Sequence, residues 1–310
     1  MHDDHNPSLA FFGRNRERWK CFACDKSGNA ISLVQEYYSC TFVEACKWIE
    51  QHFGNGTMES VYTPKRALIR KKNETIQERT TFSSSIAEKI IEDSQLTQTG
   101  QRFLFDERKY DRKVVQALNI ISIDKADKLI AQLLKRFGQE ELVKSGIFTL
   151  SNSKLYLRFF TPCLVYPYYD EQMAIIGIQS RFLGSERNVP RFQFISGQKT
   201  RLYNMQILAS MQQGEDLYIC EGVTDCMALL SSGKKAVAIP SATNLPKMDL
   251  MKLVKFRLHM YPDNDPAGEG AFCRLRKFFI DHFAWSFIKE PLPIGVKDYS
   301  EYYLQLRNEL

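Results

Sequence analysis

Three acidic residues directly follow two apolar segments of the chain and could bind a divalent metal ion. Glu221 follows residues 217–220, and Asp263 and Asp265 follow residues 256–261. Residues two apart lie on the same side of an extended chain, so Asp263 and Asp265 point toward one pocket. Clustered carboxylates repel one another, and Mg²⁺ relieves this repulsion while keeping coordination positions for water and phosphate. An Asp-x-Asp pair alone is usually a solvated turn, but together with Glu221 at a second strand end it predicts metal-dependent phosphate chemistry.

The elements that must position these acids alternate between strand and helix. Residues 217–220, 235–240 and 256–261 are apolar runs that predict strands, and residues 225–230 carry apolar side chains at helical spacing. This alternation is typical of a parallel sheet, whose ligands bind beyond the carboxyl ends of the strands. We therefore expect residues 214–310 to form a Rossmann-like domain with a mostly parallel sheet.

The amino-terminal part of the chain predicts a small unit followed by a linker. Residues 1–54 contain apolar residues at helical spacing over 30–38 and 42–53, after a strand near residues 18–20. Residues 55–85 are polar and basic and lack a sustained apolar period, so we expect a flexible, positively charged linker there.

Residues 86–213 combine both kinds of element. Helical patterns run to residue 150, and residues 158–167 and 174–182 then predict two strands joined by the turn 169–172. The expected fold class is a multidomain α+β and α/β protein.

The composition is that of an ordinary globular protein with a mild basic excess. The 310 residues include 44% hydrophobic and 25% charged residues, and the net charge is +6. This charge is compatible with nucleic-acid binding without being diagnostic of it. No apolar run approaches the roughly 18 residues of a membrane-spanning helix, and the first residues do not resemble a signal peptide. We expect a cytoplasmic protein without a membrane partner.

Residues 218–230 and 261–270 resemble the TOPRIM domain, which bacterial-type primases share with several topoisomerases and nucleases. The resemblance implies that Glu221, Asp263 and Asp265 bind Mg²⁺ or Mn²⁺, with Asp225 as a supporting catalytic acid. Residues 295–301 resemble a further acidic segment of the primases and offer Asp298. Ser300 stands where a second Asp often follows in that segment, which leaves a second metal position open.

The segment before residue 214 resembles the RNA-polymerase core of the same primases. Residues 160–170 and 176–181 are similar to its strand pair, residues 195–203 are similar to its basic segment, and residues 100–146 are similar to the segment that opens the core. A polymerase needs cations to hold a template backbone and an incoming triphosphate. The resemblance assigns this role to Arg181, Lys199 and Arg201, with Tyr203 nearby. Each of the three cations alone would equally fit a basic surface loop.

Cys21 and Cys24 have the spacing of zinc ligands. Residues 2–11 resemble the start of the primase zinc ribbon of the CHC2 type, whose pattern is Cys-x-x-His followed by Cys-x-x-Cys. On that register His2, Cys21 and Cys24 bind Zn²⁺, and the first cysteine would precede Met1. Either residues are missing before Met1, which we favour, or His5, water or the terminal amine completes the site. The alternative is a pair of buried thiols without metal.

Basic and aromatic side chains interleave in residues 11–20, where Phe11, Phe12 and Trp19 stand among arginines and a lysine. This mixture suits single-stranded DNA, because cations contact phosphates while aromatic rings stack on bases. It equally suits a solvated ribbon edge with a few core aromatic residues.

These segments together resemble a bacterial DnaG-type DNA primase in a short form. The implied function is template-directed synthesis of RNA primers from ribonucleoside triphosphates on single-stranded DNA, a nucleotidyl transfer that serves DNA replication. A replicative helicase would then act in trans, and the end at Leu310 suits an accessory primase of a plasmid, phage or other mobile element. The rival functions are a TOPRIM-type nuclease and a non-catalytic single-stranded DNA-binding module with a degenerate site. Ser300 and the incomplete zinc set motivate the second rival.

Overall fold

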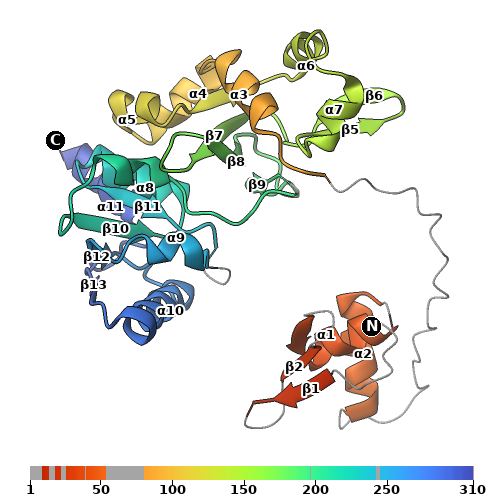
Figure 1. The fold of residues 1–310 in the computed structure, drawn as a ribbon, viewed down its shortest axis with the longest axis vertical. Helices are drawn as coiled ribbons and strands as arrows, with labels where there is room; N and C mark the ends of the chain where they lie inside the picture. Colours follow the sequence, from red (N-terminus) through yellow and green to blue (C-terminus); the bar gives the residue numbers. More distant parts are fainter. Residues whose placement is uncertain are drawn as a thin grey trace. The chain divides into compact units, whose positions relative to one another are not determined.

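A computed structural model describes residues 9–13, 18–21, 26–38, 40–53, 80–195, 197–241 and 245–309. The chain forms two compact units, Met1–Gln77 and Glu78–Leu310 (Figure 1). Their boundary falls inside the predicted linker of residues 55–85. In the described part of the chain, no helix combines the length and the apolar character needed to span a membrane.

The first unit contains a three-stranded antiparallel sheet and two helices. The elements are β1 (Leu9–Phe12), β2 (Arg18–Cys21), β3 (Ser27–Asn29), α1 (Ala30–Tyr38) and α2 (Phe42–Phe53). Thr41 and Glu44 explain where α2 begins: the Thr41 amide donates to the Glu44 carboxylate at 2.8 Å, and the Glu44 amide donates to Thr41 Oγ1 at 3.4 Å. This reciprocal capping satisfies amides that no helical carbonyl can reach.

The aromatic residues of the first unit divide into core and surface. Trp19 is 1% exposed and its indole N–H donates to the Asn29 carbonyl at 2.9 Å, so it packs in the core and cannot stack on a base. Phe11 and Phe12 are 51% and 44% exposed. Cys21 is buried at the end of β2, whereas the other predicted zinc ligands, His2, Cys24 and the alternative His5, lie outside the described residues.

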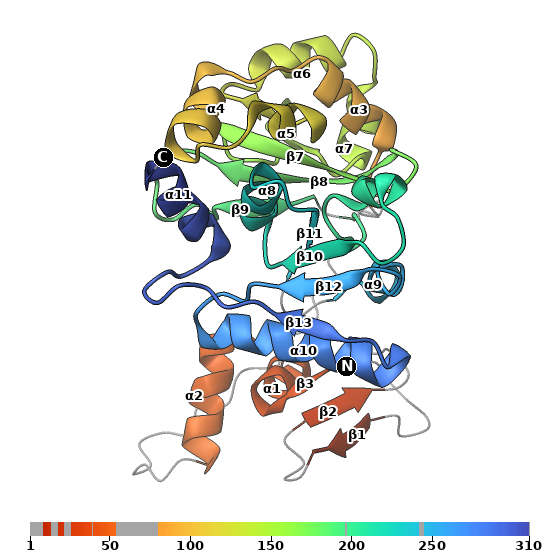
Figure 2. The same ribbon diagram turned by 90° about the vertical axis from the view of Figure 1, so that its left-hand side faces the viewer.

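The second unit begins with helices packed on an antiparallel sheet with the strand order β4-β7-β8-β9. Helices α3, α4 and α5 cover one face of this sheet (Figure 2). The helical elements are α3 (Ser84–Glu92), α4 (Gln98–Gln101), the π-helical turn η1 (Arg102–Glu107), α5 (Arg112–Ala117), α6 (Asp127–Leu133) and α7 (Gln139–Lys144). The strands are β4 (Ile121–Ile123), β5 (Phe148–Ser151), β6 (Lys154–Leu157), β7 (Cys163–Tyr169), β8 (Ile175–Phe182) and β9 (Phe192–Phe194).

The expectation of an all-helical stretch up to residue 150 was wrong at two places. Strand β4 pairs with β7, and β5 begins at Phe148 to form a hairpin with β6. Strand β4 has three residues, all of them buried. A run this short has no period that separates a strand from the end of a helix.

The carboxyl-terminal part of the second unit contains the predicted parallel sheet. The strand order is β11-β10-β12-β13, and each neighbouring pair is parallel, which confirms the Rossmann-like expectation. Helix α10 covers one face of this sheet, and α8 and α11 lie between its other face and the antiparallel sheet (Figure 2). The elements are η2 (Met205–Ser210), β10 (Asp216–Cys220), α8 (Val223–Ser231), β11 (Ala236–Ala238), α9 (Lys247–Met251), β12 (Arg257–Met260), α10 (Pro266–Phe283), β13 (Phe287–Lys289) and α11 (Tyr299–Glu309).

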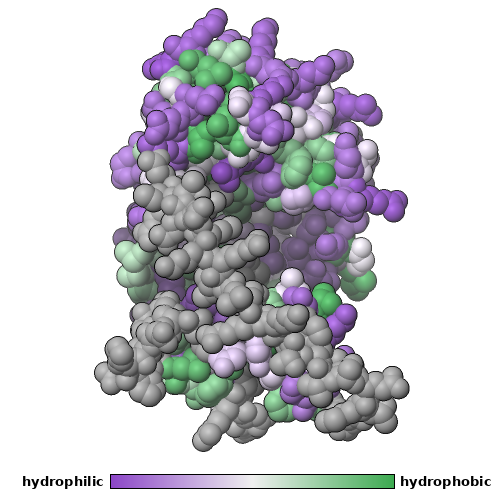
Figure 3. Space-filling view, turned by 90° about the vertical axis from the view of Figure 1, so that its right-hand side faces the viewer, coloured by the Kyte–Doolittle hydropathy of each residue, from purple (hydrophilic) through white to green (hydrophobic). Residues whose placement is uncertain are grey.

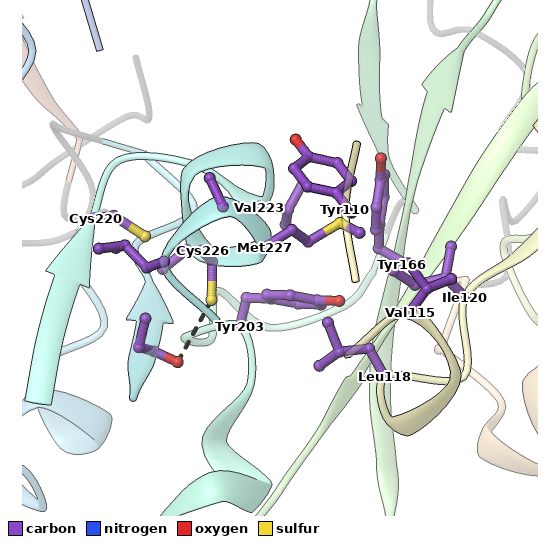
Figure 4. Close-up of a cluster of buried hydrophobic side chains, with 14 of the residues drawn as sticks. Tyr110, Val115, Leu118, Ile120, Tyr166, Tyr203, Cys220, Val223, Cys226 and Met227 are labelled. Atoms are coloured by element: carbon purple, nitrogen blue, oxygen red, sulfur yellow. Dashed lines mark hydrogen bonds between the residues drawn. The ribbon is translucent and has the colours of Figure 1, made fainter. Parts of the chain in front are cut away.

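A hydrophobic cluster, which we call the shared core, joins the two halves of the second unit. Tyr110, Tyr166 and Tyr203 crowd against Val223 and Met227 of α8 (Figure 4). Because these side chains come from the helical segment, the antiparallel sheet and the parallel-sheet region, the halves exclude water from one common interior. The predicted domain boundary between residues 213 and 214 stays a prediction. On the described surface in Figure 3, hydrophobic patches are bordered by hydrophilic side chains, as is normal for a folded protein.

Candidate functional site

The pairing of β10 with β12 brings the predicted metal ligands to one edge of the parallel sheet. Leu217 of β10 lies opposite Leu258 of β12, so the residues that follow the two strands are neighbours. Glu221 Oε1 accepts a hydrogen bond from the Asp263 amide at 3.3 Å. The two signals that the sequence placed 42 positions apart thus meet at the carboxyl edge of the sheet.

The loop that carries Asp263 and Asp265 leads directly into helix α10. Asp265 is the N-cap residue, and its Oδ1 accepts from the amides of Ala267 and Gly268, each at 2.9 Å. Asn264 donates from its amide nitrogens to the carbonyls of Val296 and Lys297, at 2.6 and 2.7 Å. These bonds hold the Asp-x-Asp loop between α10 and the segment that precedes Asp298.

Two glycines border the acids, and only one of them is required by the backbone. Gly222 has φ −159°, an extended conformation that any residue adopts, and an added Cβ would meet nothing nearer than 3.8 Å. The backbone at Gly222 therefore does not require a glycine. Gly268 lies so close to the loop before α10 that a Cβ would stand 2.4 Å from the Asp263 carbonyl oxygen. A side chain at Gly268 would displace Asp263, a requirement that the sequence pattern did not reveal.

Asp225 and Asp298 lie on the α8 and α11 side of the same edge. Asp225 is buried in the first turn of α8, and its Oδ1 accepts from the Ser300 amide at 2.9 Å. Asp298 Oδ1 accepts from the Glu301 amide at 2.8 Å, at the start of α11. Together with Glu221, Asp263 and Asp265 they form what we call the acidic cluster.

Burial and mutual repulsion raise the pKa values of three members of the acidic cluster. Burial, followed by the charges of Asp225 and Glu221, raises the pKa of Asp263 to about 8. Burial, followed by the charge of Asp298, raises the pKa of Asp225 to about 7. Burial also raises the pKa of Glu221, with a further contribution from Asp265. These carboxylates resist ionisation in the metal-free protein because each one faces other negative charges.

The donor set of the acidic cluster suits a hard divalent cation. No described group of three or more His, Cys, Asp or Glu side chains is close enough to enclose a metal ion as it stands. One carboxylate oxygen accepts a hydrogen bond from a backbone amide in each of Glu221, Asp265 and Asp298. The Asp263 carboxylate accepts no hydrogen bond from the described residues. Burial raises the pKa of this carboxyl group. A half-buried carboxylate without a donor, surrounded by other acids, fits Mg²⁺ or Mn²⁺, whose binding would relieve the repulsion.

Arg181 of β8 occupies an unusual position for a cation. It is 5% exposed, and its guanidinium group lies over the rings of Phe103 and Phe192, at 4.5 and 5.0 Å. Its Nε has no hydrogen-bond partner among the described residues. Burial lowers the pKa of Arg181, and the nearby positive charges of Arg108 and Arg191 act in the same direction. The Arg181 guanidinium group therefore lies among aromatic rings and other positive charges.

The other predicted nucleotide-binding residues have different surroundings. Lys199 is exposed to solvent. Tyr203 is 0% exposed, lies in the shared core and forms an isolated antiparallel bridge with Ala238, so as placed it has no surface to offer a nucleotide. Arg201 Nε donates to both carboxylate oxygens of Asp249, at 2.8 and 3.1 Å. The roles assigned to these residues stay predictions, and the contacts of Arg201 and Tyr203 are those of packing residues.

The ion pair of Arg201 with Asp249 predicts a stability effect. Asp249 is buried, and its Oδ2 also accepts from the Leu202 amide at 2.9 Å. Asp249→Ala leaves a cation and an amide without their acceptor, and we expect it to lower the free energy of unfolding by about 3 kcal/mol in chemical denaturation. Asp281→Ala removes an acid from an exposed pair with Lys277 and should cost less than about 0.5 kcal/mol. Equal losses in the two variants would show that the Asp249 contacts are not stabilising.

Comparison with known proteins adds family information to this geometry. The family model described as CHC2 zinc finger matches residues 1–62, and the model described as Toprim-like matches residues 218–303. A DNA primase of Lactococcus lactis is 23% identical over 321 residues, which cover 98% of this chain and 48% of that protein. A DNA primase of Clostridium acetobutylicum is 24% identical over 283 residues, with 88% and 46% covered. The chain thus spans about half the length of the curated relatives that it matches.

The fold is shared with solved primase structures. The zinc-binding and RNA-polymerase domains of the Aquifex aeolicus primase align with a TM-score of 0.58 at 18% identity, covering 99% of this chain and 76% of that one. A DnaG primase catalytic domain bound to single-stranded DNA aligns with a TM-score of 0.57 at 19% identity, covering 73% of this chain and 77% of that one. Two domain matches, alignment along nearly the whole chain and a common fold make this chain similar to the DnaG-type primases.

Proposed function

We propose that this chain is a DNA primase that synthesises short RNA primers on a single-stranded DNA template. The observation that carries the proposal is the acidic cluster at the carboxyl edge of the parallel sheet, where the half-buried carboxylate of Asp263 accepts no hydrogen bond from a described residue. Acids in this arrangement favour divalent metal and phosphoryl transfer. The antiparallel sheet that carries Arg181 shares a hydrophobic core with this site, which favours polymerisation over a free-standing nuclease.

In the proposed mechanism the acidic cluster binds the metal, and the arginines bind phosphate. A divalent cation held by Glu221, Asp263 and Asp265 would supply positive charge for the triphosphate and the departing pyrophosphate. Asp225 and Asp298 support this site through their negative charge, since both raise the pKa of Asp263. Arg181, whose Nε has no hydrogen-bond partner among the described residues and whose guanidinium group lies over two phenylalanine rings, is the cation that we propose for a template or nucleotide phosphate.

We also propose the partners and cofactors that this activity requires. The partners are a single-stranded DNA template, ribonucleoside triphosphates and a replicative helicase in trans, and the site of action is the cytoplasm. Zn²⁺ bound through His2, Cys21 and Cys24 would order the first unit, where the exposed Phe11 and Phe12 are available to stack on template bases. Origin from a mobile element stays a prediction.

The activity can be tested directly with the full chain. Labelled ribonucleotides, a single-stranded DNA template and Mg²⁺ or Mn²⁺ should yield short RNA products, and omission of template or addition of a chelator should abolish them. Cleavage of the template without incorporation would replace the primase by a nuclease. Template binding with neither reaction would favour a non-catalytic module.

A further inference from the structure

Tyr110 links the helical segment of the second unit to the acidic cluster. It lies between η1 and α5, is buried, and its hydroxyl donates to the Thr224 carbonyl oxygen at 3.1 Å. Thr224 immediately precedes Asp225 in the first turn of α8. Burial raises the pKa of Tyr110, so its hydroxyl stays protonated and able to donate. A side chain 114 positions away in sequence thus contacts the backbone that carries an acid of the site.

Ser300 completes the connection from the opposite side. Its Oγ lies 3.3 Å from the Tyr110 hydroxyl and donates to the Thr224 carbonyl oxygen at 3.3 Å. Its amide donates to Asp225 Oδ1 at 2.9 Å. Ser300 and its amide bond to Asp225 are buried, and the bonds to the Thr224 carbonyl are partly buried, so leaving any of them unmade is costly. These bonds hold the backbone at Thr224 and keep one oxygen of the Asp225 carboxylate against the Ser300 amide.

The position of Asp225 matters because of its neighbour in the acidic cluster. Asp225 lies in the first turn of α8, four residues after Glu221, and Glu221 Oε1 accepts from the Asp263 amide at 3.3 Å. A small displacement of Asp225 therefore changes the electrostatic surroundings of the carboxylate that we assign to the metal. Residues that orient metal ligands from behind commonly affect metal affinity by roughly tenfold or more.

We propose that Tyr110 is a positioning residue, which through Thr224 and Ser300 holds Asp225 in the arrangement that allows the acidic cluster to bind a divalent cation. The inference rests on the proposed metal-dependent function and deepens it, because it makes metal affinity depend on the contact between the helical segment and α8. Ser300 accordingly serves as a neutral hydrogen-bonding element at a position where the sequence comparison suggested a second acid.

The test compares two tyrosines that each lose only a hydroxyl. Tyr110→Phe should raise the Kd for Mn²⁺, measured by electron paramagnetic resonance without nucleotide, roughly tenfold. Tyr303→Phe is the matched control: its hydroxyl donates to the Lys109 carbonyl at 2.6 Å, next to Tyr110 in the chain, but it has no described contact with Thr224, Asp225 or Ser300. Its Kd should stay within about twofold of the parent, although both variants lose a partly buried hydrogen bond from a tyrosine hydroxyl to a backbone carbonyl.

A second variant protects the test against a failure of folding. Ser300→Ala keeps the amide that Asp225 accepts but removes the hydroxyl, and should raise the Kd for Mn²⁺ by a similar factor. The double variant with Tyr110→Phe should be no weaker than either single variant, because the two hydroxyls act as one unit. An unchanged Kd in Tyr110→Phe or in Ser300→Ala, or an equal rise in Tyr303→Phe, would overturn the positioning role. A parent that binds Mn²⁺ but makes no primers would refute only the primase function, whereas a parent that binds no Mn²⁺ would overturn both.

Discussion

Asp263→Asn is expected to lower primer synthesis by about three orders of magnitude or more, because it removes the charge of an acid in the cluster whose carboxylate accepts no hydrogen bond from the described residues. The amide has nearly the same size as the carboxylate, so packing against Gly268 is preserved. Initial rates of ribonucleotide incorporation at saturating Mg²⁺ measure the effect. The exposed-acid variant Asp281→Asn, at the far end of helix α10, which follows the Asp263 loop, should keep the parental rate.

The same substitution should make the metal-free protein more stable at alkaline pH. The pKa of Asp263 rises from 3.8 to about 8 on folding, so the folded state disfavours the charged form. Stability from this group is complete below its unfolded pKa and declines as the pH rises from about 4 toward 8. Asparagine carries no charge, and the variant should melt above the parent at pH 8.5 but not at pH 4. Undiminished primer synthesis, or a variant less stable than the parent at pH 8.5, would contradict the assignment of Asp263 as an ionised ligand.

The affinity for divalent metal is expected to rise steeply with pH, by one to two orders of magnitude between about pH 6 and pH 8. Protons and metal compete for the same oxygens, and burial with neighbouring acids raises the pKa of Asp225 to about 7 and that of Asp263 to about 8. At pH 6 both carboxyl groups hold protons that the cation must displace. At pH 8 most of the free energy needed to remove these protons is no longer required. Titration calorimetry with Mn²⁺ at constant ionic strength measures the dependence.

The two steps of this pH dependence can be separated by substitution. Asp263→Asn should remove the rise in Mn²⁺ affinity near pH 8. The rise near pH 7, which belongs to Asp225, should remain. Because Asp225 and Asp263 interact, the two apparent pKa values describe the pair of acids as well as each residue. An affinity that is flat from pH 6 to pH 8 would mean that neither carboxylate loses its proton when the metal binds.

The acidic cluster was accessible from the sequence because its geometry follows from local rules. Glu221 and Asp263 stand directly after apolar strands, and neighbouring parallel strands end at the same edge of a sheet. Asp265 could likewise be placed, since an Asp before Pro and two small residues is a typical start of a helix. Only these local patterns and the order of elements were needed.

The roles of the other site residues depended on partners distant in sequence. Asp249 holds Arg201 in an ion pair and the shared core surrounds Tyr203, contacts that the sequence did not reveal. The nucleotide-binding roles of both residues stay predictions. Trp19 was a candidate for base stacking and is instead a core residue. A cationic or aromatic side chain can lie at the surface or in the interior of a protein. The residues that it contacts in the fold determine which of the two it occupies.

The sequence by itself determined the parallel sheet and the acids at its edge, since strand ends, turn residues and apolar period are written within short windows of the chain. Only the tertiary structure decided how those acids are held. The close approach of Gly268 to Asp263 and the bonds from Tyr110 and Ser300 to the start of α8 join segments whose sequences carry no sign of one another. Such contacts arise from packing of whole elements, and packing depends on the complete fold.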